Sequence, residues 1–245
     1  MGLRTALGLK KRSVEAKSGP DLSRSTGHIN SKPPVLQAGP LHDYCASLRG
    51  RHCIIFGSAP EPDLSSYDGQ PIVCCNGSAV SLKRLLGRAP DYTFMHCHVL
   101  ARSNPSDAAV REALTSVASI GKVVLFDDPH YAYATDLLAP LASDIAKFDW
   151  LSRYQMLDDL LGAPLPFLDL SSGAMTAALA LRHGAASAEL VGFSLGRKGH
   201  SYNPKEQYRN HVRSDAALFA LLAQIGHDLR CREPSVAMIL TRKIE

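Results

Sequence analysis

The sequence predicts an α/β fold in which a single domain is built on a mostly parallel sheet. Short apolar runs such as His52–Phe56 (HCIIF) end at turns of small or polar residues, as buried parallel strands do. The segment Ala174–Arg182 is rich in good helix formers, and another apolar run, Ala188–Phe193, follows it within a few residues. Strands that alternate with helices along the chain are typical of the α/β class.

Composition sets limits on the fold and on the partners. The chain has 245 residues, of which 45% are hydrophobic and 20% charged, enough for one large domain and a tail. The net charge of +4 is mild and no zinc-finger or basic-helix motif accompanies it, so we expect no nucleic-acid partner. The 6 cysteines form no Cys-x-x-Cys pair, which favours reduced thiols in a cytoplasmic protein. We expect neither a membrane-spanning helix nor a secretory signal, because no apolar run is long enough.

Residues 1–40 differ from the rest of the chain. They are rich in Lys and Arg, contain few acidic residues, and have frequent Ser, Gly and Pro. This composition predicts a flexible basic tail that precedes a folded domain over residues 41–245. A solvated leader is the simpler interpretation. The alternative is a peripheral tether to an anionic membrane surface, where each basic residue contributes about 1 kcal/mol.

Two turns at predicted strand ends carry candidate ligand contacts. The first strand runs into Gly57 and Ser58, and a strand followed by a small-residue turn is how nucleotide-binding α/β domains begin. Neither a G-x-G-x-x-G fingerprint nor a P-loop is present, which argues against a dinucleotide cofactor and against a P-loop site. A second strand, Pro71–Cys75, ends at Asn76, whose amide can bind a base or ribose edge. A turn Asn before Gly explains this residue equally well.

The middle of the chain contains two patterns that resemble metal sites. The third strand, Asp91–His96, runs into the tripeptide His96–His98, but no second cluster of ligands is evident, so a structural or pocket-rim role is favoured. After a helix at Asp107–Ser119, a fourth strand, Lys122–Phe126, stops at Asp127-Asp128-Pro129, which more often forms a turn. We therefore expect no metal site.

The second half of the chain is expected to hold a lid and an anion site. Residues 130–169 are aromatic-rich and helical or irregular, which predicts a lid over an acceptor site. Ser171, Ser172 and Gly173 then open the Ala-rich helix with a hydroxyl for capping and a Gly for close approach. The loop after the next strand is basic and contains Arg197 and Lys198. A helix N-terminus that faces such a loop is suited to an anion.

The C-terminal part is predicted to return to the sheet. Residues Asp215–Ile225 alternate Ala and Leu at helical spacing, and Ser235–Leu240 (SVAMIL) is an apolar run that predicts a closing strand.

The run from Ser172 to Tyr202 resembles the core of the bacterial sialyltransferases of glycosyltransferase family 42. Both have a small hydroxyl-Gly opening, an Ala-rich helix, a strand that ends in a Gly turn, and a Ser-Tyr after a Gly. The first strand and its turn (IIFGSAP) resemble the family's strand followed by Gly-Asn-Gly-Pro, and the second strand, ending CCN, resembles its Cys-Asn. His211, shortly before Asp215 and a helix, resembles the family's catalytic base.

The resemblance implies a single Rossmann-like domain with a helical lid insertion. It also implies an inverting transfer of sialic acid, a related nonulosonate or Kdo from a CMP-sugar to a glycan or glycolipid acceptor, with no metal or other cofactor. His211 would deprotonate the acceptor hydroxyl, and Tyr202 would bind the CMP phosphate as it leaves. The implied nucleotide and substrate contacts are Gly57, Ser58, Asn76, Ser171, Ser172 and Gly173. Such an enzyme is expected in the cytoplasm or peripherally on the inner face of the membrane, and a homo-oligomer is left open.

Three positions depart from the family pattern. Ser58 stands where the family has Asn, and Ser194 replaces the usual Asp. Gly196 stands where a second phosphate-binding Tyr is expected, and Arg197 or Lys198 could supply a full charge in its place.

Three functions therefore remain open. The first is an inverting CMP-sugar-dependent glycosyltransferase, in which His200 is the rival of His211 as general base. The second is an α/β transferase of another class, such as a pterin pyrophosphokinase-like protein, for which Asp127 and Asp128 are the obvious metal carboxylates. The third is a non-catalytic nucleotide-sugar-binding relative, because donor-site positions are altered.

Overall fold

The computed structural model describes residues 44–101, 105–126, 130–148, 152–162, 170–201 and 211–241. All of them belong to the unit that spans Val35–Glu245. The predicted basic tail, residues 1–40, lies outside the described residues, as do Asp127, Asp128 and Tyr202.

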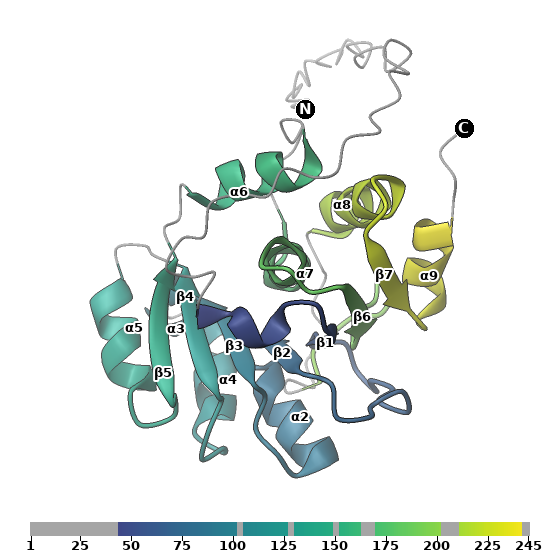
Figure 1. The fold of residues 1–245 in the computed structure, drawn as a ribbon. Helices are drawn as coiled ribbons and strands as arrows, with labels where there is room; N and C mark the ends of the chain where they lie inside the picture. Colours follow the sequence, from purple (N-terminus) through teal and green to yellow (C-terminus); the bar gives the residue numbers. More distant parts are fainter. Residues whose placement is uncertain are drawn as a thin grey trace, which may run out of the picture. The chain divides into compact units, whose positions relative to one another are not determined.

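In the described part of the chain, seven strands form one sheet, and every hydrogen-bonded pair of these strands is parallel (Figure 1). The strands are β1 (His52–Phe56), β2 (Ile72–Cys75), β3 (Tyr92–His96), β4 (Lys122–Phe126), β5 (Asp144–Phe148), β6 (Ser187–Val191) and β7 (Asp228–Cys231). Their order is β5-β4-β3-β2-β1-β6-β7. The order reverses between β1 and β6, which confirms the predicted α/β class with a Rossmann-like arrangement. In such sheets ligands bind in the crevice at the reversal.

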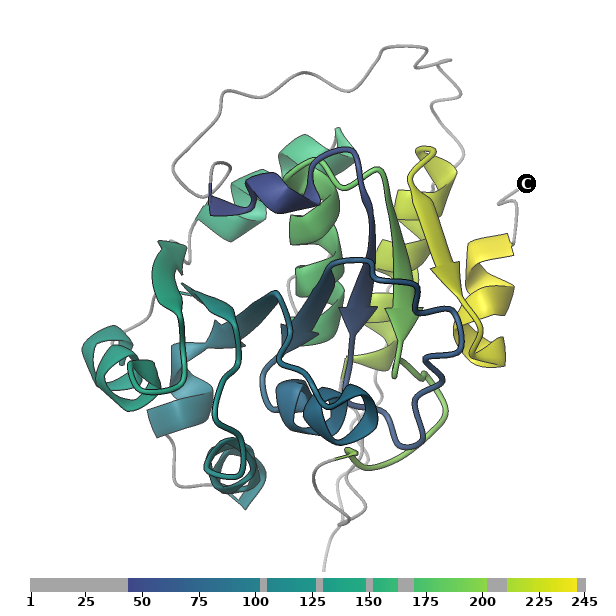
Figure 2. The ribbon, with the colours of Figure 1, turned by 60° about the horizontal axis from the view of Figure 1, so that its bottom comes forward.

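Helices cover both faces of the sheet (Figures 1 and 2). One apolar cluster packs against η1 (Ala46–Leu48), α6 (Ser152–Leu161), α7 (Ser172–Arg182), α8 (Val212–Gln224) and α9 (Pro234–Thr241). The cluster on the opposite face packs against α2 (Ser78–Leu86), α3 (Cys97–Ala101), α4 (Pro105–Leu114) and α5 (Tyr131–Leu138). None of the helices in the described ranges is long and apolar enough to cross a bilayer.

The central strands are apolar on both sides because both of their faces are covered. In β1, Cys53 and Ile55 belong to one core cluster, whereas Ile54 and Phe56 belong to the other. All four side chains are fully buried. Burial on both faces explains why this strand reads as a continuous apolar run and not as an alternating pattern.

Helix α7 lies against the middle of the sheet. Every residue from Gly173 to Leu181 is buried, and the helix contacts β1, β2, β3 and β6. Its small Ala side chains allow this close approach. Ser171 caps the helix by accepting a hydrogen bond from the Ala174 N–H at 3.1 Å, and Gly184 follows its C-terminus with φ +94.

Two predicted elements are wrong. The region 130–169, expected to be a helical or irregular lid, contains β5, which pairs in parallel with β4 along Asp144–Phe148. The run Ser235–Leu240, expected to be a closing strand, lies inside α9, and the last strand is β7. Glu233 and Pro234 decide for the helix: the Glu233 carboxylate accepts the Val236 N–H at 3.1 Å, and Pro is well suited to the first helical position.

Candidate functional site

The candidate site lies at the carboxyl ends of β1, β2 and β6, where the strand order reverses. Close backbone packing brings its parts together around the ring of Phe193. A Cβ on Gly57 would lie 2.9 Å from one edge of this ring, and a Cβ on Gly173 would lie 2.8 Å from its other edge. The end of β1 and the N-terminus of α7 are therefore separated by one phenyl ring. A Cβ on Gly57 would also lie 2.5 Å from the Gly192 carbonyl oxygen, so neither position accepts a side chain without a shift of its neighbours.

A side-chain hydrogen bond joins the end of β2 to the start of α7. The Asn76 Nδ2 donates to Ser172 Oγ at 2.8 Å, and Asn76 has a left-handed backbone with φ +46. Its Oδ1 is buried and accepts no hydrogen bond from the part of the chain that the structure describes. A buried acceptor without a donor costs about 1–3 kcal/mol. A ligand hydroxyl or amine that donates to Oδ1 would remove this cost.

The start of α7 is also tied to α8. The Ser171 N–H donates to Asp215 Oδ1 at 2.9 Å, and Asp215 is a buried carboxylate in the first turn of α8. His211 stands one turn earlier, at the N-cap position of α8, and is partly buried. Residues four apart share one side of a helix. The structure thus places His211 at the start of the helix that contacts the predicted donor site, where its carbonyl accepts the Asp215 N–H at 2.9 Å.

The loop after β6 returns to the end of β1. Ser58 Oγ lies 2.7 Å from His200 Nδ1, and the Ser201 N–H donates to the Ser58 carbonyl at 2.8 Å. Within this loop the Ser194 hydroxyl accepts the Arg197 N–H at 2.8 Å, which shapes the turn. Lys198 is exposed.

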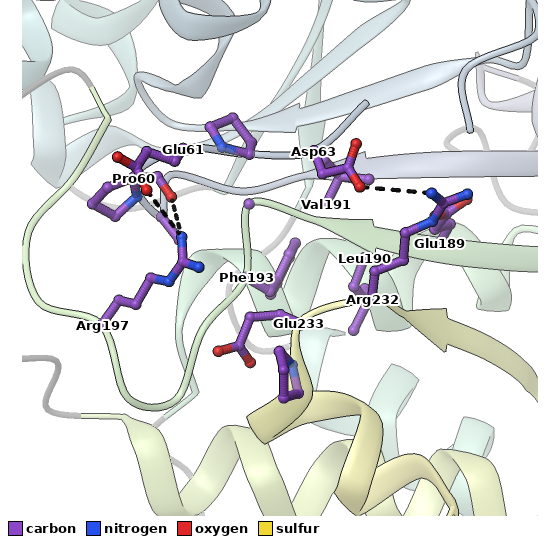
Figure 3. A pocket seen from close by; sticks show the side chains of 14 residues that line it. Pro60, Glu61, Asp63, Glu189, Leu190, Val191, Phe193, Arg197, Arg232 and Glu233 are labelled. Carbon is purple, nitrogen blue, oxygen red and sulfur yellow. Dashed lines mark hydrogen bonds and ion pairs between the residues drawn. The ribbon is translucent and has the colours of Figure 1, made fainter. Parts of the chain in front are cut away.

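The Arg197 side chain points to the loop between β1 and β2 (Figure 3). Its guanidinium donates to the Pro60 carbonyl at 3.1 Å and lies 3.8 Å from Glu61 Oε2. It lines a cavity of about 150 Å³. Arg197, one of the two basic residues that the sequence offers for the phosphate, is therefore bound to the loop between β1 and β2.

Charged groups that sequence reasoning missed surround the same cavity (Figure 3). The carboxylate of Glu189 is buried on β6, with Arg232 Nε at 3.3 Å and His52 Nε2 at 3.9 Å. Arg232 also lies 3.6 Å from Asp63. A buried charge needs a partner. The Glu within the apolar run Ala188–Phe193 therefore indicates, from the sequence alone, that a basic side chain lies beside this strand.

Within the described ranges, no two cysteines are joined in a disulfide. Burial raises the pKa of Cys45 and of Cys53 to about 12 and that of Cys231 to about 11. These three thiols stay neutral at neutral pH and do not supply a thiolate nucleophile.

The other histidine motif has a packing role. The His96 ring lies 4.5 Å from the Phe126 ring and 5.1 Å from that of His98, measured between centroids. His96 ends β3 and is buried, whereas α3 begins at Cys97. Within the described ranges, no three His, Cys, Asp or Glu side chains are grouped as metal ligands.

No protein-family model matches the sequence, and no curated protein matches it either. Among solved structures, the monofunctional α-2,3-sialyltransferase Cst-I from Campylobacter jejuni is similar, with a TM-score of 0.50 at 12% identity over 80% of this chain and 83% of that chain. The sialyltransferase CstII from the same organism, solved with cytidine-5′-monophosphate, gives a TM-score of 0.48 at 16% identity over 75% of this chain and 80% of that chain. At these identities the likeness to Cst-I shows a shared fold.

Proposed function

We propose that this protein is an inverting glycosyltransferase that uses a CMP-sugar donor of the sialic acid, nonulosonate or Kdo type. One observation carries the proposal. Asn76 and Ser172, two implied donor contacts that lie 96 residues apart, are hydrogen-bonded to each other and leave a buried acceptor for a ligand. The shared fold with a sialyltransferase supports the same reading.

The donor is proposed to lie across the ends of β1 and β2, against the N-terminus of α7. Asn76 would accept a hydrogen bond from a hydroxyl or amine of the donor. The N-terminal turn of α7 would favour the negative charge of the phosphate, because the positive end of the helix dipole lies there. Tyr202 would bind the same phosphate, as the family resemblance implies.

The proposed reaction moves one proton and exchanges one bond. The acceptor hydroxyl attacks the anomeric carbon, and His211 takes its proton as general base. The bond between that carbon and the phosphate oxygen breaks, and its electron pair leaves with CMP. Stabilisation of this developing charge is the main catalytic demand. A glycan or glycolipid hydroxyl is the proposed acceptor, and no metal takes part.

Ligand-dependent melting tests the proposal against the other transferase class. CMP should raise the melting temperature by mass action, whereas ATP with Mg²⁺ should not. CMP-sugar turnover should survive EDTA. Stabilisation by ATP with Mg²⁺ alone would favour the pyrophosphokinase-like class, and CMP binding without turnover of any CMP-sugar would favour a non-catalytic relative.

A further inference from the structure

A hydrogen bond joins two residues that the sequence separates by 142 positions. Ser58 Oγ lies 2.7 Å from His200 Nδ1. Ser58 directly follows Gly57 at the end of β1, beside the strand-order reversal. Both side chains are partly exposed, so a ligand in the crevice can reach them.

The segment that carries His200 is held on both sides. The Ser201 N–H donates to the Ser58 carbonyl at 2.8 Å, and Ser201 Oγ lies 2.6 Å from the hydroxyl of Ser81, which is buried on α2. These contacts fix the imidazole at the end of β1.

The pair sits close to a helix N-terminus that favours anions. Gly57 and Gly173 contact the same Phe193 ring, which brings the turn at Ser58 to the start of α7. A hydroxyl and an imidazole can both donate hydrogen bonds. In the imidazolium form of His200 both ring nitrogens carry a proton. Nδ1–H then donates to Ser58 Oγ, and the hydroxyl proton of Ser58 is directed to a different acceptor. In this form the pair offers two donors, the Ser58 hydroxyl and His200 Nε2–H.

We infer that Ser58 and His200 together bind the phosphate of the nucleotide-sugar donor. The inference rests on the proposed function. It concerns two departures from the family pattern, the Ser at position 58 and the Gly at position 196. Ser58 is too short to make the contact of an Asn, but it is supplemented by His200. Arg197, one of the replacements that the sequence offers for the missing Tyr at Gly196, is engaged by Pro60 and Glu61.

The two donors act on the leaving group. As the bond between the anomeric carbon and the phosphate oxygen breaks, its electron pair adds negative charge to the phosphate of CMP. Ser58 and His200 donate hydrogen bonds to that oxygen or its neighbours, while the acceptor's proton goes to His211. His200 therefore contacts the leaving nucleotide and is not the acceptor base.

Titration calorimetry with CMP and with cytidine tests this assignment. The wild-type protein should bind CMP more tightly than cytidine. The ratio of the cytidine dissociation constant to the CMP dissociation constant therefore reports the phosphate contacts. Ser58→Ala and His200→Ala should each lower this ratio by about tenfold, because each removes a hydrogen bond to a charged group. Cytidine affinity should stay within about twofold, since the base and ribose contacts are intact.

Ser187→Ala is the matched control, because Ser187 Oγ lies 2.7 Å from His52 Nδ1 in a second Ser–His pair, at the opposite ends of β6 and β1. It should leave the ratio of the cytidine dissociation constant to the CMP dissociation constant unchanged. If His200→Ala does not fold, His200→Asn keeps a donor near Ser58 but lacks Nε2, and it should show the same reduced ratio.

The outcomes distinguish a failure of the phosphate assignment from a failure of the proposed function. A wild-type protein that prefers CMP, with variants that keep the full preference, overturns the phosphate assignment and leaves the proposed function intact. A wild-type protein that binds neither CMP nor cytidine overturns the proposed function and the assignment with it.

Discussion

Substitution of Asn76 tests the donor site most directly. Asn76→Ala removes the buried Oδ1 and its predicted hydrogen bond to the donor. A ligand donor left without a partner in a buried site costs about 1–3 kcal/mol, which corresponds to a dissociation constant for CMP raised by about 5- to 150-fold. Calorimetry with CMP measures this change.

Stability should change much less than affinity. The variant loses the hydrogen bond from Nδ2 to Ser172 Oγ, about 1 kcal/mol, and places Ala at φ +46, which costs about 1–2 kcal/mol. Removal of the unsatisfied Oδ1 returns about 1–3 kcal/mol. These effects nearly cancel, so the melting temperature should stay within a few degrees of the wild type.

Asn76→Gly is the matched control, since Gly adopts the left-handed conformation without strain. It should lose the same CMP affinity as Asn76→Ala but melt higher than the Ala variant. Equal CMP affinity in wild type and Asn76→Ala would refute the assignment. A Gly variant with wild-type affinity would show that backbone strain, and not the lost amide, weakens the Ala variant.

Three further predictions concern the base, the packing and the thiols. His211→Ala should lower sugar transfer by about 10²- to 10⁴-fold in a steady-state assay while CMP affinity stays normal, because the base meets the acceptor; full activity would exclude this role. Gly173→Ala should lower the free energy of unfolding by about 1–3 kcal/mol, because its Cβ would lie 2.8 Å from the Phe193 ring. Gly196→Ala, whose added Cβ would meet no neighbouring atom within 4 Å, should leave the free energy of unfolding nearly unchanged. Denaturant titration of both variants measures the two free energies. Burial raises the pKa of the Cys53 thiol from 9.0 to about 12, so the native state keeps a proton that the unfolded chain loses. Stability should therefore be fully present below about pH 9 and fall as the pH rises toward 12, with a shallower fall in Cys53→Ala; a flat pH profile for the wild type would contradict this.

The strands that sequence reasoning placed correctly are those buried on both faces. β1 and β4 have the predicted bounds, since their continuous apolar runs follow from helices on both sides of the sheet. β5 and β7 lie at the two edges of the sheet, where the residues are largely exposed or only partly buried. Their sequences, DIAKF and DLRC, carry too little apolar signal to be distinguished from loop.

The run Ser235–Leu240 shows the opposite error. Its apolar side chains fit a buried strand as well as a helix, and periodicity over six residues does not separate the two. The decision comes from Glu233 and Pro234 just before it, which form a helix start.

The fold class, the Ala-rich helix and the turns that end β1 and β2 can be predicted from local sequence. Local composition suffices there, because burial on both faces and helix propensity act on neighbouring residues. The pairs of residues that meet at the site are known from the folded chain alone: Asn76 with Ser172, Ser58 with His200, and Arg197 with Pro60. These partners lie 96, 142 and 137 residues apart, and they are joined by the strand order and the close packing at glycines, which no local pattern encodes.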